Sequence, residues 1–525
     1  MLSVGARSGA GIISAYHSTS SGLTFLNQPS DRGPDPVIVA RADHPISRSM
    51  IASSALKVLY RLKDAGFQGF LVGGCVRDLL IGREPKDFDV ATDASPEEVR
   101  RLFRNCRLIG RRFRLAHIRF GQQIVEVATF RAAGEPITPD AEPEETDEPE
   151  ADDDVNGNVD GGGGEVDGNI ADDGDFGGDD IGNRAAPRAN TDLVHDHRGR
   201  LLRDNIYGTI DQDVWRRDFT CNALYYNIED FSIWDFTGGV ADVRSRTLRL
   251  IGDPETRYRE DPVRMLRAVR FEAKLGFTLH EGTRAPFATL AGLLENIPPA
   301  RLLDEFQKLF MAGFGQRSFE LLQHYGLLAH LFPETAAHLA SETDGLALRL
   351  IRAGLANTDR RVAEDRPVTP MFLFAVLLFG PISAAAQRRF ETGAHPGEAI
   401  AEAVDEVVAQ QNRRIGIPKR FSIPMRELLA LQPRFQRREG RRALSFLGHP
   451  RFRAAYDFLL LRAAAGGEDP ELAHWWTELQ TLPQDEQLRR VGADAPEGEE
   501  LPGAPPRRRR RRGGRGRRRA PAPET

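Results

Sequence analysis

The chain has 525 residues, of which 40% are hydrophobic, with a formal net charge of −5 and three cysteines. Its length allows about two to four domains of ordinary size, and its apolar fraction excludes a wholly disordered chain. The few scattered cysteines exclude a disulfide scaffold and a zinc site built on cysteines, and favour a reducing compartment. No run approaches the roughly 18 consecutive apolar residues of a membrane-spanning helix, so we expect no integral membrane segment.

The net charge conceals a strong asymmetry. Residues 140–180 contain 18 Asp or Glu and no Lys or Arg, so the rest of the chain carries a net charge of +13. Residues 503–525 contribute ten Arg and one Glu to that excess, and six of these Arg form the run Arg507, Arg508, Arg509, Arg510, Arg511 and Arg512. Such a charge distribution suits a polyanion such as nucleic acid. A solvated tail without a partner is the alternative.

The first 134 residues predict a disordered N-terminal extension over 1–45, without the apolar region of a secretory signal, followed by mixed α/β structure. The expected elements are a helix over 50–64, a strand over 67–72, a helix over 76–80, a strand over 87–91, a helix from 95, and strands over 116–120 and 123–130. Ser95 predicts the N-cap of its helix, with Pro96 at the first position and Glu98 closing a capping box.

After Arg131 the composition is dominated by Asp, Glu, Gly, Asn and Pro, which cannot bury enough apolar surface to offset the entropy of ordering. We therefore expect a disordered acidic insert over 135–191, and a loop at His195-Asp196-His197 beside it. Mixed α/β structure resumes near 201, and the pattern is helical from 253 to 482. The predicted fold is α+β: a head with a small mixed sheet (46–134 and 192–252), an all-α neck (253–335), an all-α body (336–485) and a disordered arginine-rich tail (486–525).

The strongest local signal is LVGGCVRD, residues 71–78, followed by KDFDV, residues 86–90. Gly73 and Gly74, between a strand and a helix, let the backbone approach a phosphate, although such turns are often only structural. If Asp87 and Asp89 lie in one strand, both carboxylates point to the same face. Two such carboxylates suit Mg²⁺ together with the phosphates of a nucleoside triphosphate, and solvated acids at a strand end are the alternative.

Two further positions complete the candidate site. Glu126 interrupts the otherwise apolar strand Ile124–Ala128, where its burial would require a partner, so it is the candidate third acid. An ion pair between Glu126 and Arg119 or Arg131 is the alternative. In the segment RRDFTCNA, residues 216–223, Arg217 suits triphosphate oxygens. Asp218 is expected to orient the arginines, bind a ribose or complete the catalytic acids.

The motifs GGxVRD, DFDVAT, EVATFR, RRDFTxNA and EDPVRMLRAVRF occur here in this order. In this the chain resembles the class II nucleotidyltransferases of the polymerase-β superfamily, a group that contains bacterial poly(A) polymerases and CCA-adding tRNA nucleotidyltransferases. The resemblance covers about residues 45–134 and 200–480. It implies a nucleotidyltransferase head and the reaction of a nucleoside triphosphate with an RNA 3′-hydroxyl.

Roles follow from the resemblance at the matching positions. It implies that Gly73, Gly74, Arg77 and Arg217 bind the nucleotide, and that Asp87 and Asp89 hold two Mg²⁺ ions, with Glu126 and Asp218 as further catalytic acids. Asp261 and Arg264 match the pair that reads the incoming base. Placed three apart on a helix, an acceptor and a donor could bond a base edge without a template, and a surface ion pair is the alternative.

The choice between the two activities depends on other segments. Residues 106–118, 417–420 and 449–457 and the arginine-rich tail resemble bacterial poly(A) polymerases, and a tail that grips phosphates without reading sequence suits many different RNA ends. We therefore expect untemplated polyadenylation of RNA from ATP. A CCA-adding enzyme and, less favoured, a catalytically silent RNA-binding protein are the alternatives. Trp475-Trp476 are expected either to stack on unpaired bases or to pack between helices, and Cys75 to be a small packing residue.

The resemblance also implies a cytoplasmic monomer active in mRNA processing and RNA decay, with the RNA-degradation machinery and RNA chaperones as partners. The acidic insert is longer than the usual connection at this point. It is expected to act either as a spacer or as a competitor of RNA for the basic tail.

Overall fold

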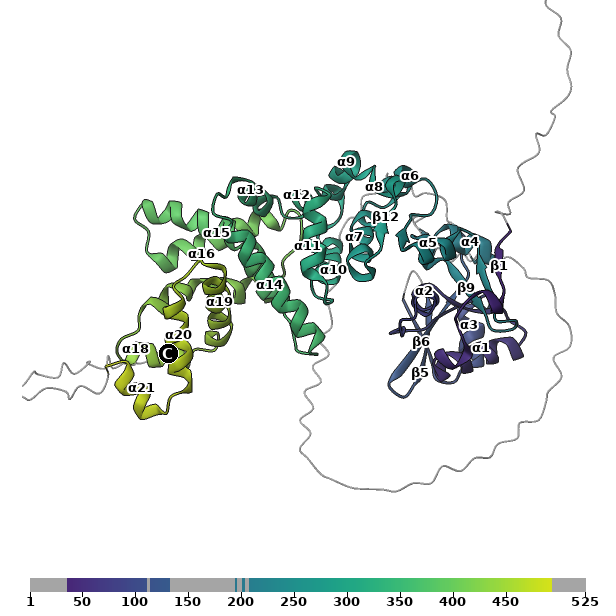
Figure 1. Cartoon of the computed structure of the whole chain (residues 1–525), viewed down its shortest axis with the longest axis horizontal. Coiled ribbons are helices and arrows are strands. Elements are labelled where there is room, and N and C mark those ends of the chain that lie inside the picture. The colour runs from purple at the N-terminus through teal and green to yellow at the C-terminus, as the bar shows by residue number, and fades with distance from the viewer. Residues whose placement is uncertain (1–34, 111–113, 133–193, 196–200, 204–206, 493–525) are drawn as a thin grey trace, which may run out of the picture. The chain divides into compact units, whose positions relative to one another are not determined.

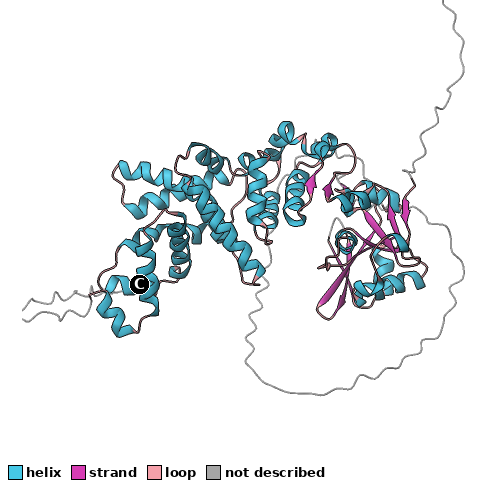
Figure 2. Cartoon of the chain, viewed as in Figure 1, coloured by secondary structure: helices cyan, strands magenta, loops and turns pink. Residues whose placement is uncertain are grey.

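A computed structural model describes residues 35–110, 114–132, 194–195, 201–203 and 207–492. It divides into two compact units, the first ending at Glu260 and including Phe277–Arg284, and the second formed by Asp261–Gly276 and the chain from Ala285 onward. The strands lie in the first unit, and the described part of the second contains helices and loops (Figures 1 and 2). The α+β class predicted from the sequence is confirmed.

The first unit is built on a sheet of eight strands in the order β1-β10-β9-β2-β3-β6-β5-β4. Neighbours in it are antiparallel except β3 and β6, which are parallel. Its strands are β1 (Val37–Val39), β2 (Gly69–Val72), β3 (Asp89–Thr92), β4 (Cys106–Ile109), β5 (Leu115–Phe120), β6 (Gln123–Thr129), β9 (Leu224–Asn227) and β10 (Ile233–Asp235). Two small pairs are formed by β7 (Val194–His195) with β8 (Leu201–Arg203), and by β11 (Thr247–Leu248) with β12 (Thr278–Leu279).

Helices pack on this sheet: α1 contacts β2, β3 and β6, α3 contacts β4, β5 and β6, and α2 lies beside β2 and β9. The helices of the first unit are α1 (Ser53–Asp64), α2 (Gly74–Leu80), α3 (Pro96–Leu102), α4 (Ile210–Trp215), α5 (Gly239–Ser245), α6 (Pro254–Glu260) and α8 (Glu281–Arg284), with short 3₁₀ turns η1 (Arg41–Asp43), η2 (Arg48–Met50) and η3 (Thr220–Asn222). Ser95 caps α3 as predicted, since its hydroxyl accepts from the Glu98 amide and the Glu98 carboxylate accepts in turn from the Ser95 amide.

The second unit is helical throughout its described length. Its helices are α7 (Val263–Leu275), α9 (Phe287–Leu290), η4 (Ala291–Asn296), α10 (Pro299–Phe310), α11 (Gly315–His324), α12 (Leu328–Leu331), α13 (Pro333–Ser341), α14 (Leu346–Ala363), α15 (Pro370–Glu391), α16 (Pro396–Gln411), α17 (Lys419–Ala430), η5 (Gln432–Gln436), α18 (Arg441–Leu447), α19 (Phe452–Ala465), α20 (Pro470–Thr481) and α21 (Gln484–Arg490).

Among the described residues, α15 alone is long and apolar enough to cross a membrane. It packs instead on α13, α14, α16 and α17, and most of its apolar window is buried inside the protein. Phe374 and Leu377 on this helix are fully buried. The expectation that no run approaches 18 apolar residues is therefore wrong for this helix, which is a core element of the second unit.

The prediction of a disordered extension over 1–45 is wrong for its last part. Val37–Val39 forms β1, which pairs with β10 at one edge of the large sheet. Val37 and Ile38 are exposed, so this strand is held by main-chain hydrogen bonds rather than by burial. A strand of three residues has no alternation long enough to be recognised in the sequence.

Candidate active site

The strand register brings the predicted acids of the head together. Asp89 in β3 lies opposite Val72 in β2 on one side and Glu126 in β6 on the other, and Glu126 lies opposite His117 in β5. Residues opposite each other in neighbouring strands point to the same face of a sheet. Asp89, Glu126 and His117 therefore form one polar row on the sheet face, and the Nε2 of His117 lies 3.4 Å from Oε1 of Glu126.

Asp89 lies in surroundings that disfavour its negative charge. Burial, followed by the negative charges of Glu126 and Asp87, raises the pKa of its carboxyl to about 6, while Arg217 opposes them. Cys75 lies beside this carboxylate, where burial raises the pKa of its thiol to about 12. The thiol donates to the carbonyl of Val72 and is a buried packing group, as predicted.

Two expectations about the acids are wrong in detail. Asp87 lies in the loop before β3 and is exposed, so strand alternation does not align it with Asp89. Its charge nevertheless acts on Asp89. The side chain of Glu126 is 48% exposed rather than buried, because β6 presents this face to solvent while Val125 and Val127 point to the core. Glu126 is therefore not the buried acid that the sequence predicted, but it does lie beside Asp89.

The turn between β2 and α2 forms one wall of the site. Gly73 has φ +78° and ψ −132°, a conformation that favours glycine, and precedes the first residue of α2. Arg77 is 2% exposed, and its guanidinium bonds Asp78 on its own helix and Oδ1 of Asn222 in η3. Arg77 thereby ties the start of α2 to the segment that follows Arg217.

Arg217 is held against this turn by a buried network that the sequence analysis did not identify. Asp213, with a side chain 1% exposed, accepts two bonds from Arg217, one from Tyr225 Oη at 2.6 Å, and bonds from Arg216. The Arg217 Nε also bonds Tyr225 Oη at 2.8 Å. Burial alone would lower the pKa of Arg217, but Tyr225 and Asp213 raise it above its usual value.

The network leaves one end of Arg217 directed at the site. A Cβ added at Gly73 would lie 3.8 Å from Nη1 of Arg217, so this nitrogen lies beside the turn. The spacing of Asp213 and Arg217, an acid four residues before an arginine at the end of a helix, is the sequence signal that could have found the pair. Asp218, the next residue, accepts from the Phe219 amide and from the side-chain amide of Asn222, so it faces the same segment as Arg77.

The residues present fit a divalent cation. Asp87 and Asp89 supply hard oxygen ligands, and the pKa of Asp89 is raised by burial first and then by the negative charges of Glu126 and Asp87, both of which a bound cation would offset. Glu126 is the neighbouring third acid. Over the described ranges, no cluster of three or more His, Cys, Asp or Glu side chains is close enough to form a metal site by itself. Further ligands would come from water and substrate phosphates, as Mg²⁺ prefers.

Asp261 and Arg264 belong to the second unit. Asp261 precedes α7 rather than lying on it, so the expected helical spacing of the pair is wrong. Its carboxylate accepts from the Val263 amide at the start of the helix and from Nη2 of Arg301 at 2.6 Å. Asp261 is thus an acceptor already engaged with an arginine, and its reading of a base stays a prediction.

Two predictions concern the C-terminal part. Trp476 is fully buried and donates to the carbonyl of Phe435, and Trp475 packs against the same hydrophobic cluster, so these residues form a packing core and not an exposed stacking platform. The run Arg507–Arg512 and the acidic insert over 135–191 lie outside the described residues.

Known proteins resemble this chain over most of its length. Poly(A) polymerase I of Escherichia coli O6:H1 is 44% identical over 457 residues, covering 86% of this chain and 88% of the relative. The chain belongs to the poly(A) polymerase I family. The Haemophilus influenzae member is 41% identical over 85% of the chain, whereas a CCA-adding enzyme of Lactobacillus helveticus is 26% identical over 75%.

Three family models match successive segments of the chain. Residues 69–249 match the "Poly A polymerase head domain", residues 276–339 the "Probable RNA and SrmB- binding site of polymerase A", and residues 392–516 the "Polymerase A arginine-rich C-terminus". Among solved structures, the Thermotoga maritima CCA-adding enzyme complexed with tRNA has a TM-score of 0.50 at 17% identity, covering 84% of this chain and 85% of that one. A "tRNA-processing enzyme (apo form 2)" has the same TM-score at 19% identity, covering 83% and 99%. These two likenesses confirm the nucleotidyltransferase fold.

Proposed function

We propose that this enzyme transfers adenylates from ATP to the 3′-hydroxyl of RNA, repeatedly and without a template, releasing pyrophosphate. The observation that carries the proposal is 44% identity to poly(A) polymerase I over 86% of the chain, against 26% to a CCA-adding enzyme. The site geometry supports nucleotidyl transfer, because it combines a glycine turn, an anchored arginine and adjacent carboxylates on one sheet face.

The protein groups have distinct roles in this proposal. Arg217, fixed by Asp213 and Tyr225, binds the triphosphate beside the backbone of Gly73, with no reorganisation at the moment of reaction. Arg77 is buried and occupied, so it positions the turn rather than contacting the nucleotide. Asp87 and Asp89 hold Mg²⁺, and Glu126 adds negative charge beside them.

When bound, Mg²⁺ supplies Lewis-acid stabilisation of the attacking hydroxyl and of the phosphate charge. The carboxylate of Asp89 is best suited to this role when it is ionised. Its pKa is raised to about 6, so a bound cation would favour the ionised form near that pH. We further propose that the RNA substrates are the 3′ ends of bacterial mRNAs in the cytoplasm.

The deciding experiment incubates the purified protein with Mg²⁺, a generic unstructured RNA and each nucleoside triphosphate in turn, followed by a denaturing gel. A long ladder with ATP alone is expected. Addition of only a few residues, dependent on both CTP and ATP and on a tRNA that lacks its end, would assign the chain to the CCA-adding activity instead. An absence of extension with every nucleotide would leave RNA binding as the function.

Asp89→Asn and Asp87→Asn test the assignment of the acids. Each is expected to abolish adenylate incorporation while RNA retention on a filter stays at the wild-type level, because the carboxylates serve the chemistry and not the grip on RNA. Asp230→Asn, in the loop between β9 and β10, is the matched control and should retain full activity. Joint loss of incorporation and retention in the Asp89 variant would contradict a purely catalytic role.

A further inference from the structure

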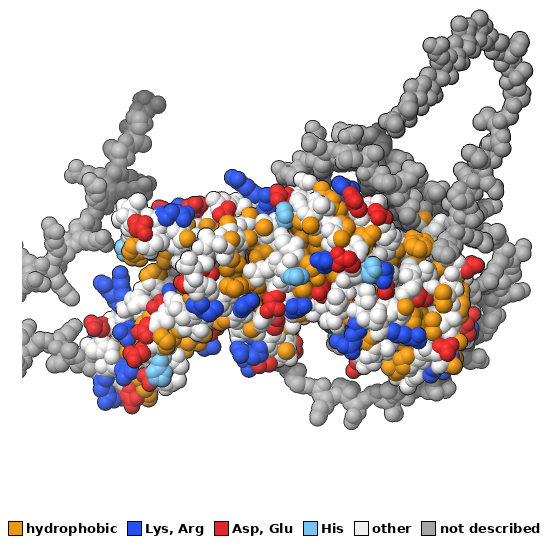
Figure 3. Space-filling view, turned by 45° about the horizontal axis from the view of Figure 1, so that its top comes forward, with side chains coloured by type: hydrophobic (Ala, Val, Ile, Leu, Met, Phe, Trp, Pro, Cys, Tyr) orange, Lys and Arg blue, Asp and Glu red, His pale blue; other side chains and the backbone are white. Residues whose placement is uncertain are grey.

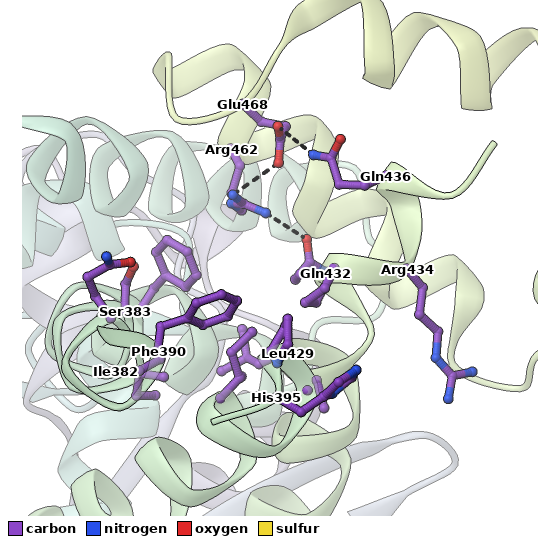
Figure 4. Close-up of a pocket in the computed structure, with 18 of the residues that line it drawn as sticks. Ile382, Ser383, Phe390, His395, Leu429, Gln432, Arg434, Gln436, Arg462 and Glu468 are labelled. Atoms are coloured by element: carbon purple, nitrogen blue, oxygen red, sulfur yellow. Dashed lines mark hydrogen bonds and ion pairs between the residues drawn. The ribbon is translucent and has the colours of Figure 1, made fainter. Parts of the chain in front are cut away.

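A large pocket lies within the second unit, among α15, α16, α17, η5 and α19. Its volume is about 820 Å³, within the range of cavities that accept small organic ligands. Figure 4 shows the ring of Phe390 extending into the hollow, near Leu429, with Arg462 above it. Phe390 is 45% exposed, although the other large aromatic side chains of this unit are mostly buried.

One wall of the pocket is polar and fixed. Arg462 bonds Glu468 at 3.1 Å and Oε1 of Gln432 at 3.4 Å, and its guanidinium lies 5.3 Å from the ring of Phe379. Gln436 bonds the same glutamate at 3.1 Å. The Nε of Arg462 is buried without a hydrogen-bond partner in the described structure. The pocket thus combines an apolar floor with amide, carboxylate and guanidinium groups that can bond a polar edge.

The rim of the pocket continues into a positively charged segment. Residues 434–442 contain five exposed arginines, Arg434, Arg437, Arg438, Arg441 and Arg442, against one glutamate. None of the five forms an ion pair with a described residue, whereas Arg389, Arg414, Arg426, Arg451 and Arg453 of the same unit are paired with carboxylates. On the face drawn in Figure 3, basic and acidic side chains are interspersed. This segment is therefore a local excess of unpaired positive charge.

We propose that the pocket binds one unpaired nucleotide of an RNA strand whose backbone runs along residues 434–442. The base stacks on Phe390, its polar edge faces Arg462, Gln432 and Gln436, and the adjoining phosphates contact Arg434 and Arg437. Stacking on an aromatic ring accepts any base, and arginine contacts with phosphate need no sequence, so the site suits RNA ends of every kind. The five arginines of residues 434–442 favour an RNA strand over a free nucleotide, because they can contact more phosphates than one nucleotide carries.

The test measures binding of a fluorescent unstructured oligoribonucleotide to the full chain, without ATP, as a function of salt. Phe390→Ala should weaken binding about tenfold with an unchanged salt slope, and Phe390→Trp should restore it. Arg434→Gln with Arg437→Gln should weaken binding and lower the slope by about 0.7 for each phosphate that the protein no longer neutralises. The matched controls are Leu460→Ala, also partly exposed, and Arg453→Gln on α19, and both should bind as wild type.

Two results would overturn the proposal. One is equal RNA affinity for Phe390→Ala and Leu460→Ala. The other is binding of free AMP that Phe390→Ala removes while RNA affinity is unchanged, which would assign the pocket to a mononucleotide. Addition of a single adenylate by the wild-type chain and by the two control variants, measured separately, tests the chemistry of the head. The failure of this proposal is thereby distinguished from a failure of the proposed chemistry in the head.

Discussion

The carboxylate of Asp213 accepts hydrogen bonds from three residues, Arg216, Arg217 and Tyr225. Almost no part of this side chain reaches solvent. A buried carboxylate by itself would have a raised pKa. Here the two arginines outweigh that effect, so the pKa of Asp213 lies below its usual value. The network therefore stabilises the fold and holds Arg217 beside the Gly73 turn, where we propose that the nucleotide binds.

We expect Asp213→Asn to lower the free energy of unfolding by about 3–5 kcal/mol at pH 7, because it leaves Arg217 buried without its anion. The pKa is lower in the folded state, so the stabilising effect is present above the unfolded value near 3.9 and is lost as the pH falls through the folded value. Urea unfolding from pH 7 to pH 3 measures the difference. It should shrink below about pH 4, and a pH-independent difference would contradict the ion-pair account. Asp211→Asn, on the same helix, is the control.

The conformation of Gly73 predicts that a Gly73→Ala substitution destabilises the protein. A Cβ at this position would meet its nearest atoms, the Asn222 carbonyl oxygen and Arg217 Nη1, at ordinary contact distances of 3.6 and 3.8 Å. Space is thus available, and the cost of Gly73→Ala is backbone strain of about 1–3 kcal/mol.

Gly82, with φ +72° and no atom within 4 Å of an added Cβ, is a matched control. Both variants should lose stability in thermal melts. Only Gly73→Ala should lose kcat/KM for ATP, since only this turn adjoins Arg217. Equal activity losses in the two variants would remove the turn from the site.

At the scale of the elements, the sequence predicted best where a local signal specifies the geometry. The Ser95 capping box and the strand, glycine turn and helix around Gly73 are in the expected places because each depends on neighbours in the chain. Asp261 was misplaced because α7 begins only at Val263, with Pro262 as its N-cap, so Asp261 lies just before the helix.

Other features of the site depend on long-range packing. The exposure of Glu126 is set by which sheet face the helices cover, and the contact of Asp213 with Tyr225 depends on the position of β9. A single sequence carries no direct signal of either arrangement.

The crossing of α14 and α15 gives a prediction for the helical unit. A Cβ at Gly354 would lie 2.6 Å from Cγ1 of Val376, so the two helices approach at a glycine. Gly354→Ala should gain about 1 kcal/mol of helix propensity but lose more to overpacking, for a net destabilisation of roughly 1–2 kcal/mol.

Urea unfolding of Gly354→Ala, alone and combined with Val376→Ala, measures this coupling. The second substitution should relieve part of the loss. Gly292→Ala, which meets no atom within 4 Å, should not destabilise the protein. Additive effects at positions 354 and 376 would disprove the close approach of the two helices.

Across the whole molecule, negative and positive charges are concentrated in different segments. Residues 140–180 contain 18 acids, and residues 503–525 contain ten arginines. Removing residues 503–525 should lower RNA affinity and reduce the dependence of log affinity on log salt, by about 0.7 for each phosphate that the tail neutralises. Single-adenylate addition at saturating RNA should stay unchanged. Salt titrations of the full and shortened chains measure the slope, and equal slopes would show that the tail does not contact RNA.

The acidic segment is expected to act in the opposite direction if it competes with RNA for basic surface. Deletion of residues 138–188 should then raise RNA affinity at low salt, with the gain vanishing as salt screens the charges. The same titration measures this gain. An unchanged affinity and slope would assign the segment the role of a spacer.

The order of the large sheet has a consequence for biosynthesis. β1 at residues 37–39 pairs with β10 at 233–235, and β2 at 69–72 pairs with β9 at 224–227, so early strands are completed by late ones. At elongation rates of about 5–20 residues per second the ribosome takes roughly ten to forty seconds to make the intervening chain. During that interval the N-terminal strands emerge with unpaired edges. The head therefore exposes aggregation-prone strand edges during synthesis, and slower translation through the acidic stretch would prolong that exposure.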